Sequence, residues 1–311
     1  MEFSYLTSRV SVVIPCHNVA KFIQQSLESV FAQTLQPREV ICVDDGSTDD
    51  TLALLKHLQT VWPRLMVIEQ TAQGACAARN TGLAHATGTW IQFFDGDDVL
   101  HPSKLEVQVK LALSEPDVNL VIGSYQEVDE NLVFQRTMIE CACPDSYVAL
   151  MKSRAGRTSS LLFRREVVVR VRGWNTGRKS SQEYDLMFRV MRLGGLVKFD
   201  EQALTQLRIR AGSITNTNVQ QNVKRMVELR VRMYELLIDD NYPFVRELQQ
   251  AFFRCVRLAY SYDRATAIQL VSTYFGAPFR PDHNRLYAVI YTLWGFERAE
   301  ALSGLRRNIK T

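Results

Sequence analysis

Two short acidic stretches each follow an apolar run of the sequence. Residues 95–98 (Asp-Gly-Asp-Asp) follow Trp90–Phe94, and residues 44–47 (Asp-Asp-Gly-Ser) follow Glu39–Val43. Neighbouring carboxylates repel one another unless a cation or hydrogen-bond donors offset the repulsion. The first stretch therefore suits a Mn²⁺ or Mg²⁺ ion that is shared with the phosphate oxygens of a substrate. A solvated turn that caps a helix would explain either stretch alone, but two in one chain favour a site.

Arg79 stands in a stretch of small side chains between Gly74 and Gly82, which reads Gly-Ala-Cys-Ala-Ala-Arg-Asn-Thr-Gly. A guanidinium presents a rigid fork of donors that suits a carboxylate, a phosphate or the face of a flat ring. The composition leaves two hypotheses open for Arg79. It pairs with Asp45, or it contacts the base or a phosphate of a bound nucleotide.

The elements that carry these residues alternate between strand and helix. Short apolar runs predict four strands at Val10–Ile14, Glu39–Val43, Leu65–Ile68 and Trp90–Phe94. Helical patterns lie between them, and this alternation predicts a parallel α/β sheet. The acidic stretches then fall at the carboxyl ends of strands, where such sheets bind ligands.

The pattern changes along the rest of the chain. Residues 120–124, 159–163 and 204–209 predict further strands, and residues 183–193 predict a helix. After Asn218 the sequence is typical of amphipathic helices. We therefore expect one domain over residues 1–216 and a helical region over residues 217–311.

The composition fits a folded protein of one large or two smaller domains, with 311 residues of which 46% are hydrophobic. A formal charge of +4 is too balanced for a chain that coats nucleic acid, so we expect no nucleic-acid partner. Residues 217–311 hold 14 Lys and Arg against 9 Asp and Glu, a formal charge of +5. The basic surface is therefore expected in the C-terminal third.

Five motifs together give the sequence a family resemblance. They are Ser11–Asn18 (SVVIPCHN), Val43–Asp49 (VDDGSTD), Gly74–Gly82, Phe93–Asp98 and Ser181–Leu186 (SQEYDL). In this order they resemble family 2 glycosyltransferases over roughly residues 9–215. The resemblance implies the GT-A fold, a mixed, mainly parallel sheet flanked by helices. It also implies sugar transfer from a nucleotide-diphosphate sugar, with a UDP-sugar favoured, usually with inversion and a divalent metal.

The resemblance assigns the first half, about residues 1–115, to the nucleotide sugar. Pro15 and His17 would line the base pocket, Asp45 would accept a hydrogen bond from the base or ribose, and Arg79 would help to hold the nucleotide. In the acidic loop, Asp97 would be the direct metal ligand and Asp95 would lie nearer the ribose while also serving the metal. The remaining contacts are assigned to Gly96 and Arg210.

Arg210, with Arg208 and Ser213, stands where the family often contacts the diphosphate. Solvated surface charge is the competing interpretation of these three residues.

The acceptor half, about residues 116–216, would supply the catalytic base. The family usually reads Glu-Asp where this chain has Gln182-Glu183, so Glu183 is the first choice and Asp185 the second. Either acid could instead be a first-turn carboxylate that the helix dipole favours. Thr158 and Trp174 would lie on the acceptor side, although a tryptophan near a loop is more often packed than stacked on a sugar.

The helices of residues 217–311 interleave aromatic residues with arginines. A packed appendage with a wet basic face is the default interpretation. The functional interpretation is peripheral contact with anionic headgroups, which suits a polyprenol-linked or glycan acceptor. We expect a cytoplasmic protein, with this region at the inner face of the cytoplasmic membrane.

Other function classes lack their motifs. A nucleotidyltransferase needs a glycine-rich loop after the first strand, where this chain has Pro15-Cys16-His17-Asn18. No GxGxxG follows Ile14, and GxSxG is absent, which argues against a dinucleotide dehydrogenase and a nucleophile-elbow hydrolase. The alternative that stays open is a non-catalytic scaffold of the same fold that binds a nucleotide sugar without turnover.

Overall fold

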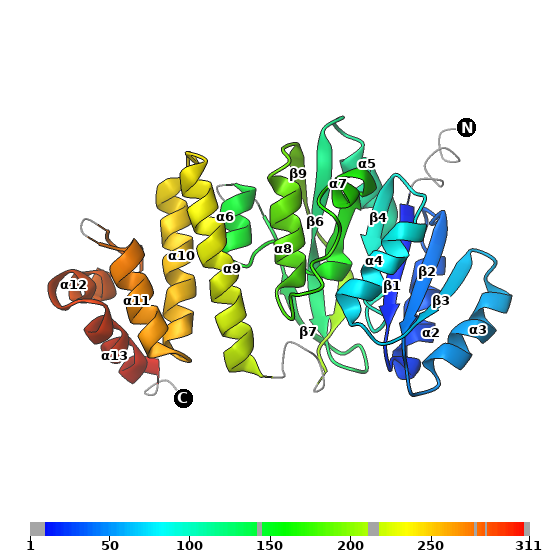
Figure 1. Cartoon of the computed structure of the whole chain (residues 1–311), viewed down its shortest axis with the longest axis horizontal. Helices are drawn as coiled ribbons and strands as arrows, with labels where there is room; N and C mark the ends of the chain where they lie inside the picture. Colours follow the sequence, from blue (N-terminus) through cyan, green and yellow to red (C-terminus); the bar gives the residue numbers. More distant parts are fainter. Residues whose placement is uncertain (1–9, 142–144, 211–217, 277–278, 284, 308–311) are drawn as a thin grey trace. The chain divides into compact units, whose positions relative to one another are not determined.

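The computed structural model describes residues 10–141, 145–210, 218–276, 279–283 and 285–307 (Figure 1). The chain divides into two compact units. The first comprises Met1–Ala142 with Ser153–Ser213, and the second comprises Cys143–Lys152 with Ile214–Thr311. The sequence placed residues 143–152 in the acceptor half, whereas in the structure this segment groups with the helical unit.

The strands in the described part of the first unit form one nine-stranded sheet in the order β3-β2-β1-β4-β8-β6-β9-β5, with β7 paired to β6. β3, β2, β1 and β4 are parallel, and β8 is antiparallel to both of its neighbours. The strands are β1 Val10–Cys16, β2 Glu39–Asp45, β3 Leu65–Gln70, β4 Trp90–Phe93, β5 Val99–Leu100, β6 Val118–Val128, β7 Phe134–Met138, β8 Leu161–Arg164 and β9 Leu196–Arg208.

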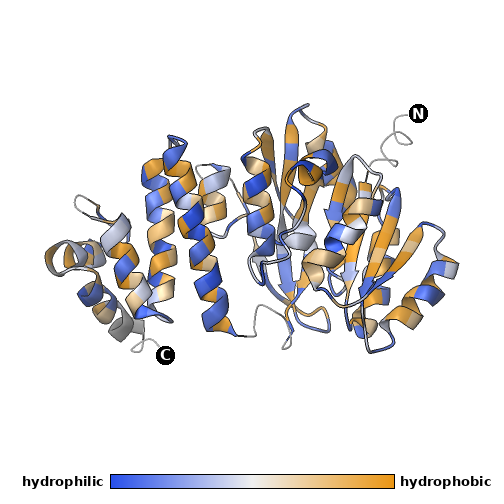
Figure 2. Ribbon diagram, in the orientation of Figure 1, coloured by the Kyte–Doolittle hydropathy of each residue, from blue (hydrophilic) through white to orange (hydrophobic). Residues whose placement is uncertain are grey.

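The four strands predicted in the first hundred residues are confirmed, as is their parallel arrangement. β1, β2 and β4 are almost wholly buried, which explains why they read as continuous apolar runs rather than as alternating ones. Figure 2 shows these strands as mainly hydrophobic. Because β1 lies between β2 and β4, the two acidic stretches follow strands that are separated by one strand.

The helices of the first unit pack on this sheet. α4 contacts β1 and β2, α5 contacts β6 and β9, and α8 contacts β6. They are α2 Ala20–Phe31, α3 Thr51–Val61, α4 Ala75–His85, α5 Lys104–Ala112, the 3₁₀ turn η1 Thr158–Ser160, α7 Arg165–Arg170 and α8 Gln182–Met191. η1 corrects part of the strand predicted at 159–163, which begins at Leu161 instead.

The second unit is helical in its described residues, as the sequence predicts. α10 packs against α9, α11 and α6, and α12 packs against α13. The helices are α6 Ser146–Met151, α9 Val219–Asp239, α10 Val245–Tyr260, α11 Arg264–Tyr274, α12 Arg285–Trp294 and α13 Phe296–Arg307. Aromatic rings fill the space between them, with Phe253 contacting Phe275, Tyr291 and Phe296. No helix among the described residues is long and apolar enough to cross a membrane.

Candidate active site

The acidic loop after β4, residues 95–98, is anchored in the protein interior by its last residue, Asp98. Asp98 is buried, and its carboxylate accepts hydrogen bonds from Ser159 Oγ at 2.5 Å and from the backbone N–H of Arg208 at 3.0 Å. The Ser159 hydroxyl in turn accepts from the backbone N–H of Asp95 at 3.0 Å. Burial raises the pKa of Asp98 well above its usual value, and Asp97 and Asp95 raise it further. Asp98 thus anchors the loop to η1 and to the end of β9.

The other two aspartates of the loop are each paired with an arginine. Arg79 Nη2 lies 2.6 Å from Asp95 Oδ1, and Arg210 Nε lies 2.6 Å from Asp97 Oδ2. The Asp95 side chain is 36% exposed and that of Asp97 14%, so both remain open to a ligand. Burial raises the pKa of Asp97, as does Asp95, while Arg210 opposes the rise. The loop thus places two carboxylates beside two guanidinium groups. The carboxylates would suit a cation, and the guanidinium groups would suit a diphosphate.

Arg79 connects this loop to the start of α8. Its Nη1 donates to Gln182 Oε1 at 3.1 Å, and its guanidinium lies over the Trp174 ring at 4.5 Å from the centroid. Arg79 is 5% exposed. Of the two hypotheses for Arg79, the ion pair with Asp45 is therefore wrong, because the carboxylate that Arg79 reaches is Asp95.

Trp174 is packed rather than presented to a ligand. It is 2% exposed, and its ring meets Phe93 edge-on at 5.0 Å. Its backbone is fixed by Asn80, which donates to the Trp174 carbonyl at 2.9 Å and accepts from its N–H at 2.8 Å. The expected stacking of Trp174 on an acceptor sugar is corrected, since the ring supports Arg79. Thr158, the other acceptor-side residue, is also buried, at 7% exposure.

Asp45 organises the turn that leads into α4. Its carboxylate accepts from Gln70 Nε2 at 2.7 Å and from the backbone N–H groups of Gln73 at 2.8 Å and Gly74 at 2.7 Å. Gly74 has φ of 93°, which favours glycine at this turn. These bonds use three of about four acceptor positions of the carboxylate. The sequence assigned Asp45 to the nucleotide or to an ion pair with Arg79, whereas in the structure its carboxylate holds the turn before α4.

His17 and Pro15 lie at the end of β1, next to Asp45. His17 is exposed, and its Nδ1 lies 2.9 Å from the Asp45 carbonyl oxygen. Because a carbonyl only accepts, this contact identifies Nδ1 as the protonated ring nitrogen. Pro15 is half-buried. The structure therefore brings three of the predicted nucleoside-side residues together at the ends of β1 and β2.

The two carboxylates at the start of α8 differ sharply in their surroundings. Asp185 is buried and accepts from Arg189 Nε at 2.8 Å, with Arg178 Nε 3.5 Å from its other oxygen. Arg189 also donates to the carbonyls of Val171 and Gly173, so Asp185 helps to hold that loop. Asp185, the second choice for the base, is thus buried and paired with two arginines.

Glu183 keeps a partly open carboxylate. Its side chain is 18% exposed, and Arg157 Nη1 lies 4.0 Å from its Oε1. It directly follows Gln182, which Arg79 joins to the acidic loop. Of the two acids, Glu183 is the more exposed and the more distant from an arginine.

Two further predicted residues have defined places. Gly96 is buried, and its carbonyl faces α2, where it accepts from Ser26 Oγ at 3.0 Å. Arg210 lies over the Phe22 ring at 5.4 Å while it pairs with Asp97. Ser213 lies outside the described residues. The sequence analysis gave no role to Asp98, Ser159 or Gln182. The signal for Asp98 was its place as the third acid of the loop.

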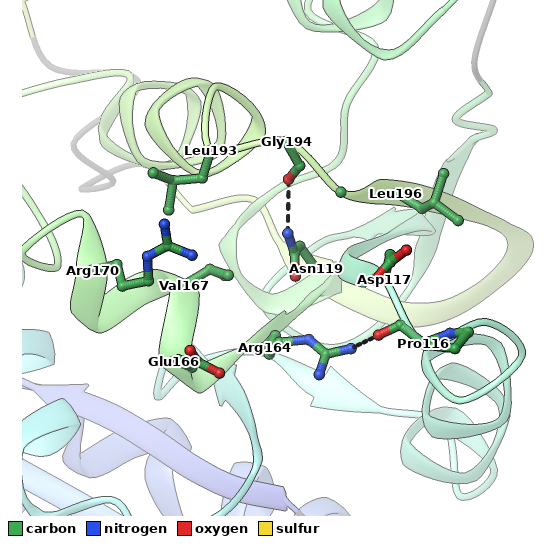
Figure 3. A pocket seen from close by; sticks show the side chains of 11 residues that line it. Pro116, Asp117, Asn119, Arg164, Glu166, Val167, Arg170, Leu193, Gly194 and Leu196 are labelled. Atoms are coloured by element: carbon green, nitrogen blue, oxygen red, sulfur yellow. Dashed lines mark hydrogen bonds between the residues drawn. The ribbon is translucent and has the colours of Figure 1, made fainter.

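A cavity of about 560 Å³ lies away from this site (Figure 3). Arg164 and Asn119 line it, and they donate to the carbonyls of Pro116 and Gly194. Arg164 pairs opposite Trp90, the first residue of β4, whereas the acidic loop follows the last. The cavity therefore opens at the other end of that strand.

Comparison with known proteins identifies the family. The sequence profile described as "Glycosyl transferase family 2" matches residues 11–181, which is more than half of the chain. The chain belongs to glycosyltransferase family 2. Glycosyltransferase GlyG of Streptococcus pneumoniae serotype 4 is 30% identical over 227 residues, covering 68% of this chain and 74% of GlyG. Glycosyltransferase GlyA of the same organism is 24% identical over 281 residues and covers 86% of this chain, but this chain spans only 40% of GlyA.

Solved structures share the fold. S. aureus TarS (residues 1–349) in complex with UDP-GlcNAc superposes with a TM-score of 0.64 at 19% identity, covering 84% of this chain and 75% of that one. The mannosyltransferase PcManGT of Pyrobaculum calidifontis, in complex with GDP-Man and Mn²⁺, gives 0.58 at 21% identity and covers 97% and 87%. The mixed sheet flanked by helices is thus the GT-A fold of this family, as the motifs predicted.

Proposed function

We propose that the chain transfers a sugar from a nucleotide-diphosphate sugar to an acceptor hydroxyl with inversion. The observation that carries the proposal is the contact of Arg79 with both Asp95 and Gln182, at 2.6 and 3.1 Å. This contact joins the loop proposed for the nucleotide sugar to the helix that begins with Gln182 and the base Glu183. The donor sugar and the acceptor hydroxyl would then lie next to each other.

A divalent metal fits the acidic loop only together with a nucleotide. The described residues contain no group of three or more His, Cys, Asp or Glu side chains that could hold an ion alone. Mg²⁺ and similar ions take one or two carboxylates and complete their shell with phosphate oxygens and water. Asp97 would be the direct ligand, with Asp95 beside it. The bound ion would act as a Lewis acid toward the charge that develops on the diphosphate.

Glu183 would act as the general base. It takes the proton of the acceptor hydroxyl while the acceptor oxygen bonds to the anomeric carbon of the sugar. The bond from that carbon to the diphosphate oxygen breaks, and its electron pair leaves with the nucleotide diphosphate. Attack from the opposite face inverts the anomeric configuration without a covalent intermediate.

Arginines would assist at both ends of this reaction. Arg210, which now pairs with Asp97, is proposed to turn to the diphosphate when the nucleotide binds. Arg79 would keep the loop and the start of α8 in register through its two contacts, while Trp174 supports its guanidinium. Asp45, His17 and Pro15 would receive the base and ribose at the ends of β1 and β2.

We favour a uridine nucleotide as donor. TarS has been crystallised with UDP and with UDP-GlcNAc, which supports this choice, whereas PcManGT binds GDP-Man. The proposed acceptor is a glycan or a polyprenol-linked sugar in surface polysaccharide or glycolipid synthesis. We propose a cytoplasmic location, with peripheral contact at the inner face of the cytoplasmic membrane.

The second unit offers a surface for that contact. Leu286, Val289 and Leu293 of α12 are 46%, 51% and 65% exposed, and helical spacing puts them on one face. Arg285 is exposed at the start of the same helix. Apolar side chains beside a cation suit the boundary between headgroups and acyl chains of an anionic bilayer.

Turnover tests the proposal. The chain is incubated with UDP- and GDP-sugars, Mn²⁺ and polyprenol-linked acceptors, and released nucleotide and product anomer are measured. The expected result is release of one nucleoside diphosphate and a product of inverted configuration. Binding of a nucleotide sugar without release or transfer would instead support the scaffold.

A further inference from the structure

Lys104 is a buried amine in an unfavourable position. It begins α5 and is 0% exposed. An ammonium loses its hydration there, and the partial positive charge of a helix N-terminus repels it. Burial lowers the pKa of Lys104 to about 7, although the carboxylate of Asp200 in β9 opposes the lowering. Since an apolar side chain would fill this space at less free-energy cost, the amine requires a polar role.

That role is visible in its contact with Gln92, at the centre of β4. Lys104 Nζ donates to Gln92 Oε1, and Gln92 is also 0% exposed. With its oxygen toward the amine, the amide turns its nitrogen the other way. Gln92 Nε2 donates to the carbonyls of Phe93 at 2.6 Å and of Ser159 at 3.0 Å.

The amine therefore fixes which way the amide points. An ammonium has three donors and no acceptor, so it can meet only the oxygen of the amide. The reverse orientation would set the amide nitrogen against the ammonium. It would also set the amide oxygen against the carbonyl oxygens of Phe93 and Ser159.

Ser159 carries this arrangement to the acidic loop. Ser159 is 0% exposed; its carbonyl accepts from Gln92, while its hydroxyl donates to Asp98 and accepts from the backbone N–H of Asp95. A continuous path thus runs from Lys104 through Gln92 and Ser159 to both ends of the loop. It links β4 and α5, which are near each other in the sequence, to η1, which lies 67 residues from Gln92.

We infer that Lys104 is a positioning residue that holds the 95–98 loop in the conformation that binds a nucleotide diphosphate with its metal. The inference rests on the proposed function, because that proposal assigns the loop to the nucleotide. Lys104 touches neither ligand, and it acts through the orientation of Gln92 and the position of Ser159.

Two variants test the path at different points. Lys104→Met keeps the length of the side chain and removes its donors. Gln92→Glu keeps an acceptor for Lys104 but, when ionised, has no donor for the Ser159 carbonyl. UDP affinity is measured by calorimetry with Mn²⁺ near pH 6, where Lys104 is charged, and the thermal midpoint is measured in parallel. We expect Kd to rise about tenfold in both variants, the scale of one buried hydrogen bond.

Gln33→Leu is the matched control. Gln33 is 2% exposed and holds the same end of α5, since it accepts from the Leu105 N–H and donates to the His101 carbonyl. It lies outside the path to Ser159. The control should lower the thermal midpoint while leaving the Kd for UDP within about twofold of the original chain.

Several outcomes would overturn the inference. One is an unchanged Kd in Lys104→Met and Gln92→Glu, and another is an equal rise in Gln33→Leu at a similar fall in midpoint. If Lys104→Met does not fold, Gln92→Glu decides alone. If the original chain binds neither UDP nor GDP, the proposed function fails. A double-mutant cycle of Lys104→Met with Ser159→Ala in unfolding free energy then decides, and additive effects would refute the path.

Discussion

At the scale of single residues, surroundings separate side chains of the same chemistry. Asp185 and Glu183 lie two positions apart on α8, yet Asp185 is engaged by two arginines and Glu183 is 18% exposed. The loop after β4 repeats this division, because Asp98 faces inward to Ser159 whereas Asp95 and Asp97 stay accessible. Burial and partners, rather than residue type, decide which acids are available for chemistry.

Glu183 is the proposed general base. Glu183→Gln removes the proton acceptor while preserving size, so transfer should fall by about 10²- to 10⁴-fold. The Kd for the nucleotide should stay the same, because Glu183 does not touch the donor in this account. Rates are measured by nucleotide release, and Kd by calorimetry.

Asp185→Asn is the comparison variant for Glu183→Gln, because it alters the other acid at the start of α8. It should lower the thermal midpoint, since Arg189 loses the carboxylate that aligns it with the carbonyls of Val171 and Gly173. Full transfer activity in Glu183→Gln, with activity lost in a stably folded Asp185→Asn, would reverse the assignment of the base.

Four residues of the candidate site could be predicted from motifs, but their pairing could not. Asp95, Asp97 and Arg79 stand out in the local sequence, and Glu183 follows from the family resemblance. The partner of Arg79 depends on the order of the strands, because β1 separates the ends of β2 and β4 and leaves Asp95 within reach of Arg79. Trp174 likewise looked like an acceptor contact until its packing under Arg79 was known.

At the scale of elements, close packing explains why α4 is made of small residues. A Cβ added at Gly82 would come within 2.3 Å of Val13 Cγ1 on β1. The helix can therefore approach the strand only with glycine at this position. Short apolar runs made the strands β1 to β4 predictable, whereas the two-residue strand β5 and the exposed edge strand β7 carry too little pattern to be recognised.

Gly82→Ala should destabilise the chain by about 1–3 kcal/mol, because the added methyl group overpacks the contact with Val13. Chemical denaturation measures the change. Gly276→Ala, where a Cβ would meet no atom within 4 Å, is the control. An unchanged stability in Gly82→Ala would mean that α4 moves away from β1 without cost.

Glu39, the first residue of β2, gives a pH prediction. Partial burial raises its pKa, but hydrogen bonds from Ser11 and Thr87 outweigh burial and lower it overall. Because the folded pKa lies below the unfolded one, Glu39 stabilises the fold above pH 4.5. That contribution is lost as the pH falls through the folded pKa.

Glu39→Gln should therefore be less stable than the original chain at neutral pH, and the difference should shrink as the solution is acidified. Unfolding midpoints at several pH values measure it. A difference that stays constant from neutral to acidic pH would show that the charge of Glu39 contributes nothing.

At the scale of the whole molecule, the family profile ends at residue 181 and the helical unit continues to the C-terminus. The sequence predicted its helical character from amphipathic periodicity. It did not predict that α6 belongs to this unit, because six residues are too short for a periodic signal. The packing of α6 against α10 is a long-range contact that only the fold reveals.

The proposed membrane contact is made by α12 of this unit. Replacing Leu286, Val289 and Leu293 together by serine should abolish sedimentation with anionic vesicles, because the apolar face of α12 is removed. The matched control replaces Val61, Met66 and Leu113, three exposed apolar residues of the first unit, and should leave sedimentation unchanged. Failure of the original chain to sediment with such vesicles would contradict membrane contact.

The central claim is that the loop after β4 binds a nucleotide diphosphate through a metal. It is tested most directly by calorimetric titration with UDP, GDP and their sugars, with and without Mn²⁺, in the original chain and in Asp97→Ala. We expect metal-dependent binding of one nucleotide that disappears in the variant. Equal binding with and without Mn²⁺, or undiminished binding in Asp97→Ala, would contradict it.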